Sequence, residues 1–306
     1  MTSAIMDAAP DTSRNGDSKA GLLAGITAYT IWGFFPVYFV LTRAVPPTEL
    51  VAHRVLWSVP FGLLIILFRR QLKDVWQALK KPKTIALLAL AAIAIATNWG
   101  IYIWAIQQDQ IFQGSLGYYI NPLAYVLIGV VFFKESLSRL QAISILFALI
   151  GVSILTIYGG VFPIISLCLV ISFTAYGVIR KQVEIGAMPG LFIETVILLL
   201  PAIFFLGWLS QTGQLQFGQL GPRIDSLLIL AGPITVLPLL AFAYAARHIT
   251  LSMLGILQYI GPTLQFALGI YFGETFTNAH ALCFGFIWLG IIIYSYDALK
   301  MHSQKS

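Results

Sequence analysis

The chain has 306 residues, of which 58% are hydrophobic and 10% are charged, with a formal net charge of +6. Soluble globular proteins carry about 25% charged residues, so the composition excludes a cytosolic enzyme, a disulfide scaffold and a disordered regulator, and it predicts a polytopic membrane protein. The positive charge is weak evidence for nucleic-acid binding, because membrane proteins concentrate lysine and arginine in cytoplasmic loops.

In chain order, the predicted elements begin with a polar tail over residues 1–19, which we expect to be disordered and cytoplasmic. Apolar runs follow, each close to the roughly 20 residues that a helix needs to cross a bilayer. A short cytoplasmic tail over 299–306 closes the chain. We therefore predict an all-α protein with ten transmembrane helices, at 20–42, 47–69, 84–107, 113–133, 138–157, 161–180, 189–209, 226–246, 249–272 and 276–298.

The lysines and arginines set the expected orientation. If both termini are cytoplasmic, 15 of the 18 basic residues fall on the inside, Arg43 and Arg223 fall outside, and Arg54 lies within a span. This skew is what the positive-inside rule expects. The basic segment 69–83 has Leu72, Trp76 and Leu79 at helical spacing, so we expect it to lie along the inner membrane surface.

An internal repeat runs through the sequence. Tyr-Ile-x-Pro, an apolar run and Phe-x-Glu occur at 119–135 and again at 259–274, and a glycine follows each glutamate by sixteen residues, at Gly151 and Gly290. The repeating unit is five spans, over 20–157 and 158–298. Because five is odd, the second copy is inverted relative to the first. Inverted repeats are typical of carriers that work by alternating access.

The sequence resembles the drug/metabolite transporter superfamily and, within it, the RarD-like members of the EamA-domain family. The likeness lies in AYTIWGFFPVYF at Ala28, HRVLWS at His53, LGYYINPL at Leu116, SFTAYGVIRK at Ser172 and GILQYIGPTLQF at Gly255. The resemblance implies ten helices, cytoplasmic termini, and export of small metabolites or toxic compounds across the bacterial inner membrane. It implies no particular substrate.

Prolines near the centres of four spans predict helix breaks. Pro60 and Pro201 occupy equivalent places in the two repeats, as do Pro122 and Pro262. A proline inside a helix removes one backbone hydrogen bond, and paired breaks in the two halves of a carrier point to a site near the bilayer midplane. The alternative is that proline is simply common in membrane helices.

Ionisable residues within spans are candidate site residues, because a charge at the bilayer centre normally faces a cavity or a partner. His53, Arg54 and Glu194 meet this description. We expect His53 and Glu194 to face a shared central cavity from opposite ends, where Glu194 could carry a proton or meet a cationic substrate. A structural ion pair for Glu194, and contact with the outer headgroups for His53 and Arg54, remain open alternatives.

Uncharged polar and aromatic residues at similar depths complete the candidate cavity. An unpaired amide in hydrocarbon is costly, so the amides need helix contacts or a cavity, whereas any single aromatic residue is more often packing. The set is Trp32, Asn98, Tyr102, Tyr119, Asn121, Tyr176, Gln258 and Tyr259. Glu135 and Glu274, after the fourth and ninth spans, are interpreted as caps of the loops that join helix hairpins.

Other functions leave no trace in the sequence. There is no G-x-S-x-G, H-E-x-x-H or Walker motif, and the remaining histidines have no metal-ligand spacing, so we expect no enzyme, no cofactor and no metal. We predict a secondary carrier, an exporter of small amino-acid-like or amphiphilic aromatic solutes. A lipid or isoprenoid-type flippase and an uncoupled facilitator remain alternatives. Coupling to protons stays open, as does the oligomeric state, which could be a monomer or a homodimer.

Overall fold

A computed structural model describes residues 19–133, 138–249 and 251–303, and within them every regular element is a helix. The predicted tail 1–19, apart from Lys19, lies outside these residues, as does Glu135. The helices of the first predicted repeat are α1 (Lys19–Gly33), α2 (Phe35–Leu41), α3 (Pro47–Phe68), α4 (Leu72–Leu79), α5 (Pro82–Gln107), α6 (Ile111–Phe133) and α7 (Arg139–Ile157).

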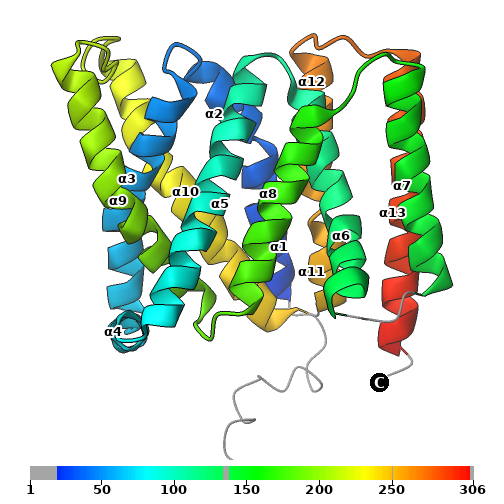
Figure 1. Ribbon diagram of the computed structural model, residues 1–306, viewed down its shortest axis with the longest axis horizontal. Coiled ribbons are helices and arrows are strands. Elements are labelled where there is room, and N and C mark those ends of the chain that lie inside the picture. Colours follow the sequence, from blue (N-terminus) through cyan, green and yellow to red (C-terminus); the bar gives the residue numbers. More distant parts are fainter. Residues whose placement is uncertain (1–18, 134–137, 250, 304–306) are drawn as a thin grey trace, which may run out of the picture.

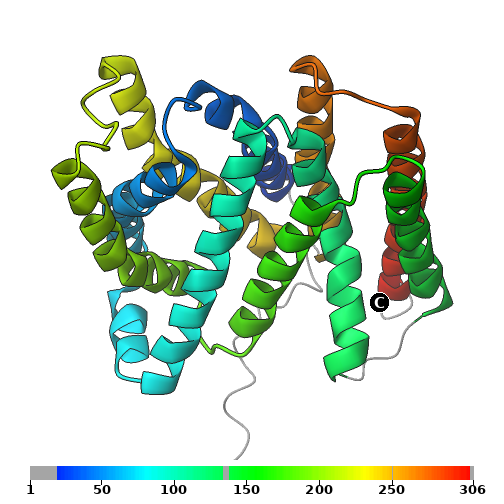
Figure 2. The same cartoon turned by 45° about the horizontal axis from the view of Figure 1, so that its top comes forward.

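The second predicted repeat is also helical throughout its described residues. It contains α8 (Ile164–Lys181), α9 (Ala187–Gln211), α10 (Pro222–His248), α11 (Leu251–Leu257), α12 (Ile260–Tyr271) and α13 (Asn278–Ser303). Figure 1 and Figure 2 show these long helices standing in two layers, with α5, α8 and α6 in front of α10, α1 and α12, and each long helix runs opposite to the long helix before it. The last helix continues to Ser303, so most of the predicted tail at 299–306 extends α13.

The described residues contain helices for ten membrane crossings. Within the described residues, nine spans are long and apolar enough to cross a bilayer, with α1 and α2 joined as one span and α11 and α12 contributing to another. The 23-residue helix α6 contains no charged residue and supplies the tenth crossing. At 1.5 Å per residue, its length matches a hydrocarbon core of about 30 Å. The predicted fold class is confirmed.

The short helix α4 marks one end of the bundle, which we call the α4 end, and we call the opposite end the far end (Figure 1). Leu72, Trp76 and Leu79 are all exposed along it, Trp76 most of all. The apolar face of α4 thus points away from the protein, as the spacing in the basic segment predicted. A helix of this kind suits the boundary between headgroups and acyl chains.

Helix contacts connect the two predicted repeats reciprocally. An added methyl group on Gly151 would lie 2.8 Å from the carbonyl oxygen of Cys283, and one on Gly290 would lie 2.9 Å from that of Ser144. Ser144 and Cys283 each follow their repeat's glutamate by nine residues. The two contacts are therefore the same contact with the halves exchanged, and glycine is needed at both because the α7 and α13 backbones approach so closely.

Other helix contacts are also equivalent when the two repeats are exchanged. Helix α1 packs on α10, and α5 packs on α8, while α3 and α9, the second spans of the two halves, pack on each other. These contacts fit two inverted halves that interlock along their length. The boundary between them at 157/158 stays a prediction.

Two of the ten crossings are interrupted, and neither interruption was predicted at its observed place. Phe34 separates α1 from α2, two residues before Pro36, and Gln258 with Tyr259 separate α11 from α12. Pro262 then falls within the first turn of α12, where a backbone N–H has no helical partner to lose.

The helices have no gap at the other three prolines, and the predicted kinks there stay a prediction. Helices α3, α6 and α9 continue through Pro60, Pro122 and Pro201. One missing hydrogen bond can be absorbed by a bend without ending the helix. Paired prolines in the two halves therefore do not mark paired gaps in the helices.

Buried apolar residues form clusters at both ends of the bundle. At the far end one continuous cluster joins α2, α3 and α5 to α8 and α10, with Phe39, Leu50, Ile103 and Leu228 fully buried within it. At the α4 end the buried residues form two separate clusters. One joins α3, α4, α5 and α9, and the other joins α1, α10 and α11. A further cluster on α6, α7 and α13 also begins at the far end, where Phe112, Leu155 and Ala279 are buried. Both ends thus contain more than one cluster, and the cluster centred on Phe39 joins helices of the two halves.

Glu274 ties the loop before α13 to the first half of the chain. Its Oε2 accepts a hydrogen bond from the backbone N–H of Phe112 at 2.9 Å, in the first turn of α6. A carboxylate at this place satisfies a free helix N–H and complements the helix dipole. The interpretation of Glu274 as a loop cap is confirmed.

Glu274 also makes the stability of the protein dependent on pH. Burial raises the pKa of this carboxyl group from 4.5 to about 7, against the lowering effect of the backbone N–H groups of Phe112 and Ile111. The folded protein then binds the proton more tightly than the unfolded chain does, so stability is expected to fall as pH rises from about 4.5 to about 7. Thermal unfolding in detergent across this range measures the slope.

Glu274→Gln is expected to flatten that slope, because the amide keeps an acceptor oxygen but does not titrate. Glu184→Gln is the matched control, since Glu184 is exposed. A slope that survives in Glu274→Gln would assign the pH dependence to another group.

Candidate functional site

Glu49 and His53 form a buried polar group in the first turns of α3, at the far end. The Glu49 carboxylate accepts hydrogen bonds from the backbone N–H groups of Gln216, at 2.9 and 3.2 Å, and of Phe217, at 3.2 Å. The His53 Nε2 lies 3.7 Å from the Glu49 Oε1. Glu49 is fully buried and fastens the loop between α9 and α10 onto α3.

His53 faces this same loop. Its Nδ1 accepts a hydrogen bond of 3.3 Å from the indole N–H of Trp57, and its ring centroid lies 5.1 Å from that of Phe217. An indole N–H can only donate, so Nδ1 carries no proton and Nε2 carries it in the neutral ring. The contacts of His53 are therefore with α3 and the far-end loop.

Arg54 points into the interior of the bundle and is 4% exposed. Its guanidinium lies over the ring of Trp99 at 4.2 Å, with the rings of Phe35 and Phe39 at 5.6 and 5.7 Å. Its Nε donates a hydrogen bond of 3.1 Å to the hydroxyl of Thr235 on α10. Cation–π contacts of this kind attract a desolvated guanidinium, and they bring α2, α3 and α5 together around it.

At the α4 end, Glu194 on α9 meets two residues of α8. Its Oε1 lies 3.4 Å from Nη1 of Arg180, and its Oε2 accepts a hydrogen bond of 3.2 Å from the hydroxyl of Tyr176. Glu194 is 1% exposed, so this ion pair is shielded from solvent. The guanidinium of Arg180 occupies the space beside Gly190, where any side chain would collide with it.

These contacts place the predicted ionisable residues in separate groups. Among the described residues, His53 contacts Glu49, Trp57 and the far-end loop, whereas Glu194 contacts Tyr176 and Arg180. The structure brings together Tyr176 and Glu194, both of which the sequence singled out. Whether His53 and Glu194 share one solute cavity stays a prediction.

The predicted amide side chains differ in whether they have hydrogen-bond partners among the described residues. Asn98 donates to the carbonyl oxygen of Leu169 and to the hydroxyl of Ser172, both at 3.0 Å, which joins α5 to α8. The side-chain oxygen of Asn121 on α6 is buried without a partner in the described residues. Asn98 is therefore part of a helix contact, and Asn121 is open to a further donor. Gln258 lies at the break between α11 and α12.

The predicted aromatic residues do not form one group. Tyr119 and Tyr259 stack at 6.3 Å between centroids, and the Tyr119 hydroxyl hydrogen-bonds that of Thr263 at 2.7 Å. Trp32 packs edge-on against Tyr29, with ring centroids 5.4 Å apart. Tyr102 contacts Phe39 and carries a buried hydroxyl that has no partner among the described residues.

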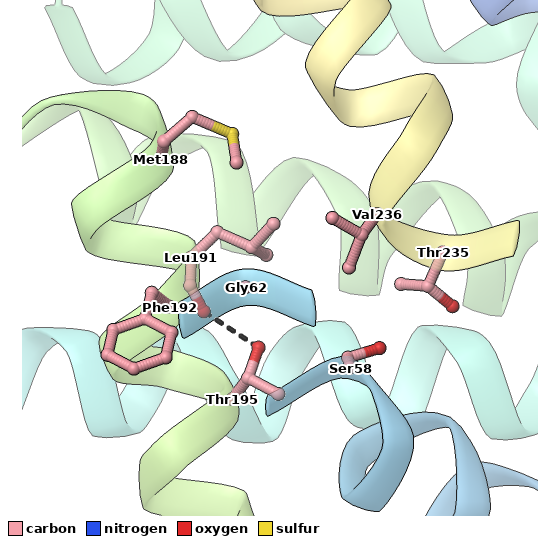
Figure 3. Close-up of a pocket in the computed structure, with 8 residues that line it drawn as sticks. All are labelled: Ser58, Gly62, Met188, Leu191, Phe192, Thr195, Thr235 and Val236. Carbon is pink, nitrogen blue, oxygen red and sulfur yellow. Dashed lines mark hydrogen bonds between the residues drawn. The ribbon is translucent and has the colours of Figure 1, made fainter. Parts of the chain in front are cut away.

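A small, partly open pocket lies between α3, α9 and α10. Figure 3 shows Ser58 and Thr235 with their hydroxyls on one side of it, and Thr195 on α9 turned back to hydrogen-bond the carbonyl oxygen of Leu191. Apolar side chains make up most of the remaining lining. The full lining is Ser58, Gly62, Met188, Leu191, Phe192, Thr195, Thr235 and Val236.

Sequence reasoning missed the partners of the residues that it selected. Glu49, Ser58, Arg180 and Thr235 all contact or neighbour a predicted site residue, but none was selected. The spacing of Glu49 and His53, four residues apart on one helix face, was an available signal. Thr235 and Arg180 gave no signal, because a single sequence does not reveal which helix faces meet.

Comparisons with known proteins agree with this architecture. Residues 19–157 match the EamA-like transporter family. The chain is 41% identical to an uncharacterized transporter of Vibrio cholerae over 93% of this chain and 94% of that one. It is 38% identical to the protein RarD of Salmonella typhi, over 94% of this chain and 98% of that one.

A solved crystal structure has a similar fold, with a TM-score of 0.59 at 19% identity over 90% of this chain and 95% of that chain. At that identity, the likeness speaks for the fold alone.

Proposed function

We propose, from the premise that this chain belongs to the EamA-like transporter family and its RarD-like members, that it is a secondary carrier that works by alternating access. The chain is a multi-pass membrane protein of a family of transporters rather than enzymes. The proposal concerns the mode, direction and substrate of transport. The observation that carries it is the reciprocal contact of the two halves, seen at Gly151 and at Gly290.

A continuous apolar cluster across α2, α3, α5, α8 and α10 supports closure at the far end. The pocket between α3, α9 and α10, whose lining includes Met188 in the first turn of α9, supports a route into the protein from the α4 end. Since the two halves make equivalent contacts, an exchange of their packing would open the far end and close the α4 end. This exchange is the way in which inverted repeats alternate access to a fixed site.

The Arg180–Glu194 pair is proposed to act in this exchange. It joins α8 to α9 close to the α4 end, and the Tyr176 hydroxyl holds the second carboxylate oxygen. Protonation of Glu194 would remove the charge that holds Arg180. Glu194 is thus the proposed proton-carrying residue if the carrier is coupled to protons, and a structural group if it is not.

The direction of transport is proposed from the basic segment around α4, and the substrate class from the residues around Arg54 and the pocket. The basic segment around α4 supports a cytoplasmic α4 end and cytoplasmic termini in the bacterial inner membrane. A solute would then enter from the cytoplasm and leave at the far end. Aromatic rings around Arg54 and apolar side chains around the pocket support amphiphilic, amino-acid-like or aromatic solutes.

Purified protein in liposomes provides the test. We expect saturable flux of at least some members of a panel of labelled amino acids and aromatic drugs, and a faster flux when a pH gradient is imposed. The expected dependence follows from the titratable Glu194 at the α4 end. Initial rates against solute concentration, with and without the gradient, are the measurement, and empty liposomes are the control.

Other outcomes would replace the proposal. Flux that rises linearly without saturation would favour a channel. Saturable flux that ignores the gradient would leave an uncoupled facilitator. Absence of solute flux, together with accelerated exchange of fluorescent lipids between leaflets, would favour a flippase on the same fold.

A further inference from the structure

Arg54 is a buried cation that has no counter-ion among the described residues. The ion pairs among the described residues join Arg43 to Asp109, His53 to Glu49 and Arg180 to Glu194, and none includes Arg54. Leaving a buried charge unpaired is strongly unfavourable, and a charge within a membrane span normally faces a partner or a functional cavity. The position of Arg54 therefore calls for an anion that this part of the chain does not supply.

The hydrogen-bonding capacity of Arg54 is also largely unused. A guanidinium carries five N–H donors and no acceptor, and the described residues offer one bond, from Nε to the hydroxyl of Thr235. Trp99, Phe35 and Phe39 contact the cation through their ring faces, which satisfy charge but accept few directed bonds. The outer edge of the guanidinium is thus free to bind a carboxylate through two parallel bonds.

The pocket reaches Arg54 through Thr235. Thr235 lines the pocket and accepts the Arg54 Nε–H bond. Ser58 lines the same side, four residues after Arg54 on α3, and its hydroxyl is buried without a partner among the described residues. Figure 3 shows the two hydroxyls on the side of α10 and α3, where Val236 also lies, and Leu191 and Phe192 on the opposite side, on α9. The pocket thus has hydroxyl groups on one side, of which that of Thr235 contacts Arg54, and mostly apolar side chains elsewhere.

We infer that Arg54 binds a carboxylate of the transported solute, with the hydroxyls of Ser58 and Thr235 beside it and the apolar part of the solute in the pocket between α3, α9 and α10. This inference rests on the proposed function as a carrier and narrows its substrates to amphiphilic molecules that carry a carboxylate. Arg54 is then a binding residue, and the solute supplies the missing anion.

Binding to the purified full-length protein tests the inference without transport. The probes are two matched pairs, 3-phenylpropanoate with 3-phenylpropanamide and L-phenylalanine with L-phenylalaninamide. Each pair differs in the carboxylate alone. Isothermal titration of the protein in detergent is expected to show at least about tenfold tighter binding of the carboxylate in one or both pairs, the equivalent of one good charged hydrogen bond.

Substitution of Arg54 identifies the residue responsible. Arg54→Gln is expected to bring the carboxylate and the amide of a pair to equal affinity. Arg54→Lys is expected to keep part of the preference, because it retains the charge but loses the planar fork. Arg43→Gln, which removes one arginine from an exposed pair at the far end, is the matched control and should bind as wild type does. Size-exclusion profiles establish that each variant is folded. If Arg54→Gln does not fold, the test is made with Arg54→Lys.

The outcomes separate this inference from the proposed function. Equal binding of carboxylate and amide by the wild type would overturn the inference. A full preference for the carboxylate in folded Arg54→Gln would also overturn it. So would a full preference for the carboxylate in Arg54→Lys together with a changed affinity in Arg43→Gln. Carboxylate binding through Arg54 without any flux in liposomes would uphold the anion site and count against the carrier. Flux of amides and carboxylates at equal rates would uphold the carrier and count against the anion site.

Discussion

Transport by Glu194→Gln is expected to fall to less than about a tenth of the wild-type rate, while the protein remains folded. The Glu194 carboxylate is 3.4 Å from Arg180 and accepts a bond from Tyr176. A hydrogen bond to a charged group is worth about 1.5–3 kcal/mol, and each 1.4 kcal/mol changes an equilibrium about tenfold. The variant would leave Arg180 without an anion and would shift the balance between the two states of the carrier.

Initial flux in liposomes, together with the size-exclusion profile of the detergent-purified variant, measures this effect. Glu184→Gln is the matched control, since Glu184 is an exposed carboxylate in the loop between α8 and α9. Residual flux in Glu194→Gln should no longer respond to a pH gradient if Glu194 carries the proton. Wild-type flux in the variant would remove Glu194 from the mechanism.

Gly232→Ala is expected to destabilise the protein by about 1–3 kcal/mol, the usual cost of overpacking a dense interior. A methyl group on Gly232 would collide with the carbonyl group of Trp57, a backbone group that cannot rotate away. Helices α10 and α3 would have to separate. Since Trp57 also donates a hydrogen bond to His53, the change would loosen the polar group at the far end as well.

Gly100→Ala is the comparison that isolates this collision. Gly100 lies inside α5, and a methyl group there would meet no atom within 4 Å. Alanine is favoured over glycine within helices by about 0.5–1 kcal/mol, so Gly100→Ala should be neutral or stabilising. Thermal unfolding of both variants in the same detergent gives the answer, and equal melting temperatures would mean that the α3–α10 contact yields more readily than its geometry implies.

The ten crossings were predictable because each is a long apolar run, and a run of that length is typical of a transmembrane helix. The repeat could also be predicted, since Gly151 and Gly290 stand at equal distances from equivalent glutamates and prove to make equivalent contacts. The helix breaks could not be predicted in the same way. Proline is compatible with a continuous membrane helix, as Pro60 shows, and the break at Phe34 depends on how α1 and α2 pack.

The candidate site was predictable only in part. Arg54 and Glu194 could be selected because a charge within an apolar run is conspicuous. Their partners could not, because Thr235 and Arg180 lie on other helices and resemble ordinary residues of their surroundings. Glu49 was missed for a different reason. It stands at the start of its helix, where a carboxylate usually faces water, yet here the loop between α9 and α10 covers it.

The interlocking of the two halves has a consequence for biosynthesis. Helix α1 packs on α10 and α12, and about 180 residues separate the end of α2 at Leu41 from the start of α10 at Pro222. At 5–20 residues per second, a ribosome needs roughly 10–40 s to make that stretch. During this interval α3 must stay in the bilayer with Glu49 and Arg54, before Phe217 and Thr235 exist to contact them. The interior of this protein is therefore completed late, and the insertion of α3 is the step of synthesis most exposed to failure.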